Sequence, residues 1–531
     1  MNLDLDYSQP YVSARSPVMG RNMVSCSQPL AAQAGMEMLQ QGGNAVDAAI
    51  AAAMVLTVVE PTGCGIGSDA FAIVWDGKTL QGLNASGRAP AGWTREHFAG
   101  QQQMPERGWG AVTVPGAVSA WVALSDRYGK LPFATLAGPA IRYARDGYLL
   151  TPIIATLWRN GAALLKDQPG FAECFMPDGR APKAGERVQL PDHARTLQAI
   201  AESKGEAFYR GALAEAIVAH AKANGSVLSL EDLANHSIDW VDTISVPFAG
   251  AHVHELPPNG QGIATLAALG MLEMTTFGDQ PVDNVDTLHQ ALEAMKLALA
   301  DLAHHVADQD HMRVRNEDLL APDYLRQRAG LITGEASDPG HGDPRPGGTV
   351  YLSAADESGM MVSFIQSNYM GFGSGVVVPG TGISLQNRGA GFSLEPDHVN
   401  VVAPGKRPFH TIIPGFVMAD DGTPLMSFGV MGGPMQSQGH VQMMLRILKY
   451  RQNPQAAIDA PRWRLEAGKH VAVEANFDAG VLQQLRERGH DIHVEAPSGV
   501  FAFGGAQIII KTDVGYIGGS DSRKDGQVVA S

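Results

Sequence analysis

The chain has 531 residues, of which 45% are hydrophobic and 18% are charged, values that are ordinary for a globular enzyme. Its formal net charge of -15 excludes the basic surface that nucleic-acid binding requires, so we expect no nucleic-acid partner. A chain of this length exceeds one ordinary hydrophobic core, and either two domains or one large interwoven fold is therefore expected.

The N-terminal region and the cysteines bear on where the protein works. The first twenty residues are polar and contain no charged segment followed by an apolar one, so we expect no secretory signal. The longest apolar run, residues 48–59, is too short to span a bilayer and predicts a buried helix, so no membrane partner is expected. Cys26, Cys64 and Cys174 have no CxxC or metal-ligand spacing and are typical of free thiols in a reducing compartment. These features together predict a cytoplasmic protein.

Residues 27–59 predict two packed helices. Two glycines end the first helix, and Asn44 with Asp47 three residues later has the pattern of a capping box for the second. The glycine-rich residues 63–67 that follow do not fit the pattern Gly-x-Gly-x-x-Gly between a strand and a helix. We therefore expect no nucleotide site there.

In the next part of the chain, the sequence pattern predicts mostly structural elements with few candidate functional residues. Residues 71–95 predict short strands and turns, in which Arg88 is either a solvated surface arginine or a ligand for a substrate carboxylate. Residues 245–256 predict a single strand. Apolar residues at helical spacing predict helices over residues 117–128, 133–146, 195–201, 212–224 and 263–275.

A further helix, near residues 287–308, carries several histidines and acidic residues. His289 with Glu293, and His304 with Asp308, have the i, i+4 spacing that some metal sites share. No HExxH pattern accompanies them, and polar contacts between helices are the alternative interpretation. We expect no catalytic metal and no other cofactor.

Thr349 lies where a segment rich in proline and glycine, residues 338–348, meets a predicted strand. The segment cannot hold a helix or a central strand and predicts an exposed loop. Residues 349–355 are β-branched, aromatic and apolar, and a turn over residues 356–359 leads to a returning strand over residues 360–367. The sequence therefore predicts a hairpin that begins at Thr349.

This position has two interpretations. Gly-Gly-Thr is a common sequence, and it could mark only a strand that begins after a glycine hinge. The alternative is a self-cleaving N-terminal nucleophile. Breaking the bond between Gly348 and Thr349 would give Thr349 a free α-amine, whose ordinary pKa is about 7.7–8. That amine would serve as a general base beside a hydroxyl that is a weak nucleophile without one.

Motifs spread over nearly the whole chain bear on this choice. In chain order they are GGNAVDAA (42–49), EP (60–61), VPG (114–116), PPNGQG (257–262), TVYLSAAD (349–356), GFGSG (371–375), GISLQN (382–387), KRP (406–408), GG (432–433) and GSDSR (519–523). With these motifs the chain resembles the γ-glutamyltranspeptidase family of N-terminal nucleophile hydrolases.

The resemblance implies an α+β fold, a four-layer αββα sandwich in which helices cover both outer faces of two stacked sheets. It also implies a proenzyme. Residues 1–348 would form the large chain and residues 349–531 the small chain, and the two would share one core. A homodimer of such heterodimers is an arrangement that the sequence leaves open.

The resemblance also implies a catalytic set. Thr349 corresponds to the nucleophile, and Ser367 to a hydroxyl residue that is hydrogen-bonded to it. Gly432 and Gly433 follow a predicted strand over residues 425–431, and their backbone N–H groups would form the oxyanion hole.

Several positions depart from the transpeptidase pattern. Gly391 stands where the family has the acidic residue that binds the substrate's amino group, Arg388 replaces a glutamine, and His410 with Thr411 replaces paired serines. Without an ammonium partner a buried acid would be costly. Arg88, Arg388, His410 and Thr411 are therefore the expected substrate-binding residues, in a pocket that suits a compact anion bearing an amide.

This pattern resembles the branch of the family that contains the oxamate amidohydrolases of purine and allantoin breakdown. Such an enzyme would attack the amide carbonyl of oxamate with Thr349, release ammonia, and let water free oxalate. Two alternatives stay open. One is a hydrolase or transpeptidase that acts on glutathione or another γ-glutamyl amide, and the other is a homologue that never matures and acts as a binding or scaffold protein.

Overall fold

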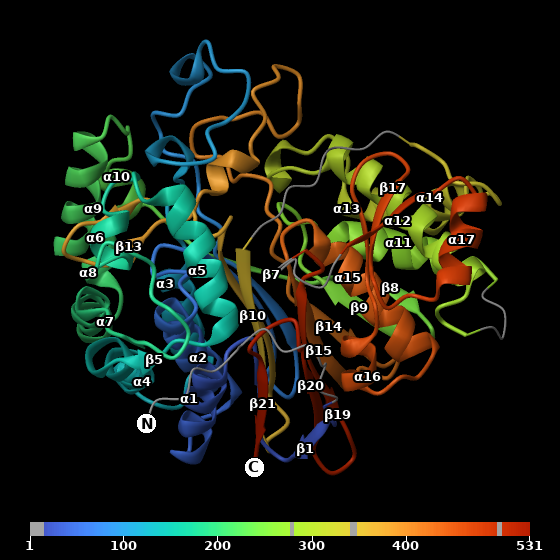
Figure 1. The fold of residues 1–531 in the computed structure, drawn as a ribbon, viewed down its shortest axis with the longest axis horizontal. Helices are drawn as coiled ribbons and strands as arrows, with labels where there is room; N and C mark the ends of the chain where they lie inside the picture. Colours follow the sequence, from blue (N-terminus) through green and yellow to red (C-terminus); the bar gives the residue numbers. More distant parts are fainter. Residues whose placement is uncertain (1–14, 277–280, 340–347, 496–501) are drawn as a thin grey trace.

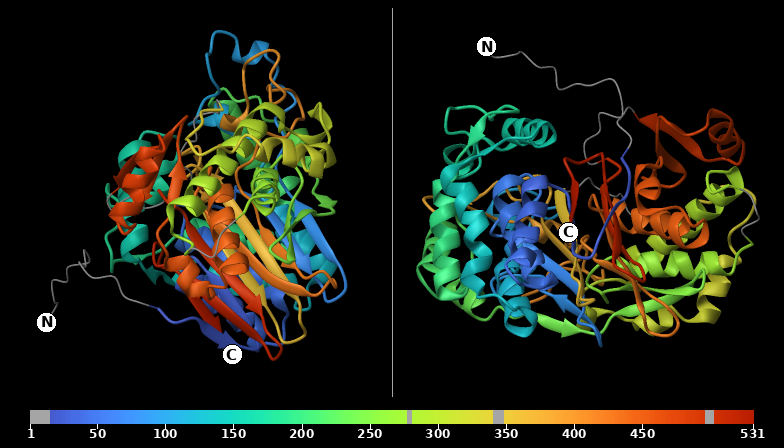
Figure 2. Two further views of the ribbon diagram at one scale, coloured as in Figure 1. Left: turned by 90° about the vertical axis from the view of Figure 1, so that its right-hand side faces the viewer. Right: turned by 90° about the horizontal axis from the view of Figure 1, so that it is seen from below.

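The structure is a computed structural model of the chain, and it describes residues 15–276, 281–339, 348–495 and 502–531. Most of the loop predicted over residues 338–348 therefore lies outside the described residues. Two seven-stranded sheets stack face to face at the centre, and helices cover both outer faces (Figures 1 and 2). The α+β, four-layer αββα sandwich expected from the sequence is thus confirmed.

Neighbouring strands are antiparallel throughout both large sheets. The first sheet has the order β1 (Val18–Gly20), β20 (Tyr516–Ser520), β19 (Gly505–Lys511), β15 (Pro424–Met431), β14 (Gly415–Met418), β9 (Ala251–Glu255) and β8 (Ile244–Phe248). The second has the order β21 (Gln527–Ala530), β2 (Met23–Cys26), β10 (Gly348–Ala355), β11 (Met361–Tyr369), β3 (Asp69–Trp75), β4 (Leu80–Asn84) and β7 (Asp239–Val241).

Helices from the two halves of the chain form the outer layers (Figure 1). On the side of the second sheet lie α1 (Pro29–Gln40), α2 (Ala45–Val59), α3 (Ala117–Tyr128), α4 (Phe133–Asp146), α5 (Pro152–Leu165), α6 (Phe171–Phe175), α7 (Pro191–Ser203), α8 (Glu206–Tyr209), α9 (Ala212–Ala223) and α10 (Leu230–Ala234). On the side of the first sheet lie α11 (Gly262–Glu273), α12 (Val285–His305), α13 (Asn316–Leu319), α14 (Pro322–Ala329), α15 (Met435–Met444), α16 (Pro454–Asp459) and α17 (Ala479–Glu487).

Smaller sheets complete the architecture. They pair β5 (Tyr148–Leu149) with β6 (Arg187–Val188), β12 (Val377–Val378) with β13 (Ile383–Ser384), and β16 (Trp463–Leu465) with β17 (His470–Glu474) and β18 (Asp491–Glu495). Among the described residues, no helix is both long and apolar enough to cross a membrane.

Helix α2 confirms the prediction made for the longest apolar run. All of its residues are buried, as expected for a helix that is apolar on every side. It packs against β10 and β11 on one side and α4 on the other. Its first turn is closed by the predicted capping box, in which the Asn44 side chain accepts from the Asp47 N–H at 3.0 Å and Asp47 accepts from the Asn44 N–H at 3.0 Å.

Two sequence predictions were wrong in detail. Residues 245–256 form two strands, β8 and β9, because the chain reverses at Ala249 and Gly250, both with positive φ. Alternation of buried side chains continues on both sides of this turn, and this regular pattern concealed the reversal although Gly250 is a typical turn residue. Helix α12 ends at His305, so Asp308 lies beyond it and does not share a helix with His304.

Strands from both sides of residue 349 lie side by side in the second sheet. β10 pairs with β2 on one edge and with β11 on the other, and β11 pairs in turn with β3. The predicted hairpin that begins at Thr349 is therefore confirmed, and it lies in the middle of the sheet. This position buries the start of β10 between the two halves of the molecule.

Candidate functional site

Thr349 is fully buried near the start of β10. Its Oγ1 lies 3.1 Å from Oγ of Ser367 on the paired strand β11, and Nε2 of Gln436 donates to it at 3.3 Å. The register of the β10–β11 pair shifts between Gly348 and Val350. Irregularities of this kind re-aim a side chain and occur often next to active sites. The structure thus places the Thr349 hydroxyl against two polar side chains at a break in the strand pairing.

The backbone beyond Ser367 turns sharply. Tyr369 has φ 79°, which is unusual for a residue with a side chain, and its N–H donates to Ser367 Oγ at 2.8 Å. The glycine-rich residues 63–67 support this turn, since the Asn368 N–H donates to the carbonyl of Gly63 at 3.1 Å. A Cβ at Gly63 would lie 2.9 Å from Cγ1 of Val350, which explains a glycine there by close packing.

Gly432 and Gly433 form the connection from β15 to α15. Their φ values of 129° and 62° lie in the region that favours glycine. The carbonyl of Gly433 accepts from Nε2 of Gln261 at 2.8 Å, which fixes the orientation of the peptide. Because α15 also supplies Gln436, which contacts the Thr349 hydroxyl, the two glycines lie at the same end of the sandwich as Thr349.

Arg388 is fully buried in a short helical turn (Arg388–Gly391). Its Nη1 donates to Thr411 Oγ1 at 2.8 Å, and its guanidinium carbon lies 4.6 Å from the centre of the Tyr369 ring. Its Nε and Nη2 have no hydrogen-bond partner among the described residues. Burial lowers the pKa of Arg388 to about 10, so the group keeps its positive charge at neutral pH.

His410 is directed to Asp69, the first residue of β3. Its Nε2 lies 3.1 Å from Asp69 Oδ2, and both side chains are fully buried. Burial raises the pKa of Asp69 to about 7, against the opposing effect of Arg388, and burial also lowers the pKa of His410 well below its usual value. His410 is therefore neutral, and its ring is engaged by Asp69.

Arg88 lies apart from this group. Its side chain is 35% exposed and is close to Asp308 at 3.7 Å and to Asp239 at 3.9 Å. Its Nη1 also donates to the carbonyl of Gly405 at 3.2 Å. In the described part of the chain, Arg88 is not among the residues that line the cavity beside the site.

A cavity of about 520 Å³ adjoins the site. Tyr369, Thr411 and Pro434 connect it to Arg388 and to the glycine pair, and Leu302 and Phe409 belong to its apolar wall. The structure thus brings together five of the predicted residues, Thr349, Ser367, Gly432, Gly433 and Thr411, with Arg388 directly behind Thr411 and Tyr369.

Four polar or aromatic residues of the site had not been predicted to have a role. They are Asp69, Gln261, Tyr369 and Gln436. Gln261 belongs to the motif PPNGQG, and Gln436 lies in the first turn of the helix after the glycine pair, so position within a motif was the available signal. Asp69 had no such signal, because only the strand register places it opposite Ser367.

Two groups of side chains among the described residues could hold a metal ion. They are His289, Glu293 and His490, and Glu466, His493 and Glu495. Neither group contains a residue that lines the cavity beside Thr349.

Comparison with known proteins identifies the family. The sequence model of gamma-glutamyltranspeptidase matches residues 31–531. The chain belongs to the γ-glutamyltranspeptidase family. It is 37% identical over 525 residues to the oxamate amidohydrolase proenzyme of Klebsiella pneumoniae, covering 96% of this chain and 98% of that one. It is 36% identical over 524 residues to a glutathione hydrolase-like proenzyme of Bacillus subtilis, covering 97% and 99%.

A solved relative in the γ-glutamyltranspeptidase family has nearly the same structure. The crystal structure of cephalosporin acylase from Bacillus halodurans matches with a TM-score of 0.96 and 49% sequence identity, over 100% of this chain and 99% of that one. Membership of this family makes the chain an N-terminal nucleophile hydrolase that acts on C–N amide bonds. The proenzyme relatives imply a precursor that is cleaved into a large and a small chain.

Proposed function

We propose that Thr349 is the nucleophile of a self-processing amidohydrolase that cleaves a small amide whose acyl group carries a carboxylate, with oxamate as the first candidate. The observation that carries this proposal is the environment of the Thr349 hydroxyl. It is buried, contacts Ser367 and Gln436, and lies at a break in strand pairing directly after Gly348. In this proposal the hydroxyl held by these contacts attacks the carbonyl that precedes it.

Maturation would proceed by an N-to-O acyl shift. Thr349 Oγ1 attacks the carbonyl carbon of Gly348, the C–N bond breaks, and an ester forms while the nitrogen takes up a proton. Water then hydrolyses the ester and leaves a carboxylate on Gly348 and a free α-amine on Thr349. Ser367 orients the hydroxyl in this step. The products are the chains 1–348 and 349–531.

The mature enzyme would use the same hydroxyl on its substrate. The α-amine of Thr349 accepts the hydroxyl proton as Oγ1 attacks the amide carbonyl, and the N–H groups of Gly432 and Gly433 stabilise the oxyanion. The proton passes to the leaving nitrogen, and ammonia departs from oxamate. Water then attacks the oxalyl ester and releases oxalate.

Arg388 and Thr411 would bind the substrate's carboxylate. A guanidinium group matches a carboxylate with two parallel hydrogen bonds, and Nε and Nη2 of Arg388 are the two donors that have no described partner. Tyr369 and Thr411 separate these donors from the cavity, so the bound carboxylate would displace the Tyr369 ring. We propose that the role of His410 is indirect and depends on its contact with Asp69. Binding of the substrate's carboxylate by Arg88 stays a prediction.

The cavity supports a second candidate, an acylase for a larger acyl group. A volume of about 520 Å³ with apolar walls falls in the range of drug-sized ligands and exceeds what oxamate needs. The solved relative with 49% identity is a cephalosporin acylase, an enzyme named for a larger substrate. Both candidates share the nucleophile and differ in the acyl group.

The first test of the proposal is intact mass spectrometry of freshly purified wild type beside Thr349→Ala and Thr349→Ser. We expect two fragments that meet at Gly348 and Thr349 in the wild type, one chain in the alanine variant, and slower cleavage in the serine variant, which keeps a hydroxyl. A single uncut wild-type chain would favour the scaffold alternative. Cleavage of the alanine variant would overturn the role of Thr349.

The second test compares three substrates of the cleaved enzyme. Ammonia release from oxamate supports the first candidate, and release of an aniline from a glutaryl anilide alone supports the acylase. Release from a γ-glutamyl anilide alone would overturn both and indicate a glutathione hydrolase. Gly391 in the cavity wall argues against that outcome, because glycine has no carboxylate for the ammonium group.

A further inference from the structure

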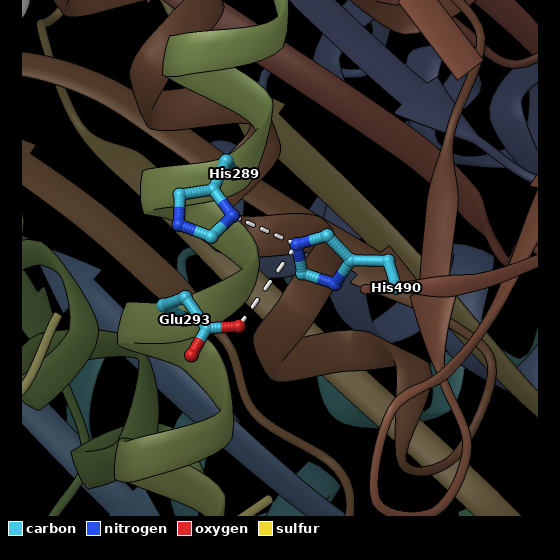
Figure 3. Close-up of side chains that lie close together, drawn as sticks. All are labelled: His289, Glu293 and His490. Atoms are coloured by element: carbon cyan, nitrogen blue, oxygen red, sulfur yellow. Dashed lines mark hydrogen bonds and ion pairs between the residues drawn. The ribbon is translucent and has the colours of Figure 1, made fainter. Parts of the chain in front are cut away.

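The described segment that precedes the cleavage region is held by a buried polar cluster on the side of the first sheet. We call residues 333–338 the anchored segment. The anchors are His289, Glu293 and Lys296 on α12, together with the turn around His490 that connects α17 to β18. Figure 3 shows His289 and Glu293 on the same face of α12, with His490 pointing toward both.

Ser337 is bound through both its backbone and its side chain. Its N–H donates to Oε2 of Glu293 at 3.0 Å, and its hydroxyl donates to the same oxygen. Its carbonyl accepts from Nζ of Lys296 at 2.9 Å. Lys296 and Glu293 themselves form an ion pair at 2.7 Å with fully buried side chains. This one buried pair therefore hydrogen-bonds to the N–H, the hydroxyl and the carbonyl of Ser337.

Two further contacts fix the rest of the anchored segment. Nε2 of His289 donates to the carbonyl of Thr333 at 2.7 Å, and the Ala336 N–H donates to the carbonyl of Arg488 at 2.7 Å. At the end of the segment Asp338 lies against Gly468, where a Cβ would come within 3.0 Å of its carboxylate. The segment is thus fixed against α12 and against residues that follow Thr349 in the sequence.

The hydrogen bonds of the two histidines are consistent with an anchor. Because Nε2 of His289 donates to a carbonyl, its Nδ1 accepts from Nε2 of His490 at 2.8 Å. Burial, with a further contribution from Lys296, lowers the pKa of His490 to about 3, so this ring is neutral. The pair links α12 to the turn that carries Arg488.

His289, Glu293 and His490 are close enough together to resemble a metal site, but the charges around them disfavour binding of a metal ion. The ammonium group of Lys296 lies 2.7 Å from Oε1 of Glu293, the oxygen that would bind the ion. A divalent cation would add two positive charges to a buried site whose carboxylate is already neutralised, and such uncompensated burial is costly. The ligand atoms are instead engaged by protein groups.

We infer that the Glu293–Lys296 pair positions the chain for self-cleavage by fixing Ser337, a described residue from which the chain continues toward Gly348. This inference rests on the proposed cleavage at Gly348. Fixing the described chain ahead of a reacting group lowers the conformational entropy lost on reaching the reactive arrangement, and misplacement of reacting groups by about 1 Å can cost on the order of a hundredfold in rate. The pair is therefore a set of positioning residues for maturation and has no part in turnover by the cleaved enzyme.

The test follows cleavage during cell-free synthesis of the full chain by intact mass spectrometry. The variants are Ser337→Ala, which removes one hydrogen bond, and the double variant Glu293→Gln/Lys296→Met, which leaves no unpaired buried charge. We expect both to mature more slowly than the wild type, the double variant on the order of tenfold. The cleaved fraction of each should have the kcat and KM of the wild type.

A matched control is Asp301→Asn/Arg328→Met. Asp301 also lies on α12 and forms a largely buried ion pair with Arg328 at 2.9 Å, and within the described part of the chain neither side chain hydrogen-bonds to the anchored segment. This variant should mature at the wild-type rate. Equal slowing in the control would show that loss of stability alone delays cleavage and would overturn the inference.

Other outcomes separate this inference from the proposed function. If the two test variants mature at the wild-type rate, the inference alone is overturned. It is also overturned if kcat of the cleaved variants falls by as large a factor as the rate of maturation. Stoichiometric zinc in the purified wild type, lost in His490→Ala, would also overturn it in favour of a metal site. An uncut wild type overturns the proposed function and this inference with it.

Discussion

At Arg388 a guanidinium group is buried with only part of its hydrogen-bonding capacity met by the protein. Nη1 is satisfied by Thr411 and the face of the group by the Tyr369 ring, while Nε and Nη2 have no described partner. Buried donors without partners are costly, and they persist in native proteins where a ligand or water completes them. At this scale the charge of Arg388 and its donors without a described partner support the proposal of a substrate with a negative charge.

Replacing Arg388 should therefore weaken binding of an anionic amide. We expect Arg388→Met to raise KM for oxamate or a glutaryl amide roughly ten- to a hundredfold, since hydrogen bonds to charged groups are worth about 1.5–3 kcal/mol. Steady-state kinetics on the cleaved enzyme measure this. Arg88→Met is the comparison, and an equal or larger rise in KM there would assign the carboxylate to Arg88.

At the scale of elements, the connection from β15 to α15 has little freedom to change. Gly432 has φ 129°, and a Cβ there would lie 2.9 Å from Cα of Gly504. The same connection leads into the helix that carries Gln436, whose amide contacts Thr349. A shift of this turn would therefore move both the proposed oxyanion donors and a contact of Thr349.

Gly432→Ala should lower both stability and activity. Backbone strain of this kind costs about 1–3 kcal/mol, and displaced oxyanion donors should reduce kcat on the order of tenfold or more. Thermal unfolding and kinetics measure the two effects. The control is Gly422→Ala, which has a φ of 81° but no atom within 4 Å of the added Cβ. Full activity in Gly432→Ala would contradict the oxyanion role.

At the scale of the whole molecule, the two predicted chains are woven into one core. In the second sheet β2 lies between β21 and β10, and β3 lies beside β11, so strands from before and after residue 349 are hydrogen-bonded neighbours. In the first sheet β1 pairs with β20 and β9 with β14. The proposed cleavage at Gly348 would break one bond in this arrangement and leave the pairings intact.

The two fragments should consequently remain associated after cleavage. We expect them to elute together from a sizing column in native buffer, with a mass of 56.2 kDa by light scattering, and to separate only in denaturant. A mass of twice this value would support the homodimer of heterodimers. Separate elution of the fragments without denaturant would contradict the shared core.

Much of this protein follows from local sequence. The apolar run of α2, its capping box and the hairpin from β10 to β11 were predicted because their signals lie within a few residues of one another. Thr349 was predicted from the residues around it and from motifs that occur in the family, and the structure places it against Ser367 as expected. The strands β8 and β9 were missed because the alternation of buried side chains continues on both sides of their turn at Ala249 and Gly250.

The surroundings of the site were decided only by the tertiary structure. Asp69 with His410, and Gln436 with Thr349, join residues that are distant in sequence, so no local pattern could reveal them. Burial then determines their chemistry, because it makes His410 neutral and leaves part of Arg388 without a partner. The sequence by itself thus determined most of the elements and the choice of Thr349 as the proposed nucleophile, whereas packing of the two sheets decided which polar groups surround it.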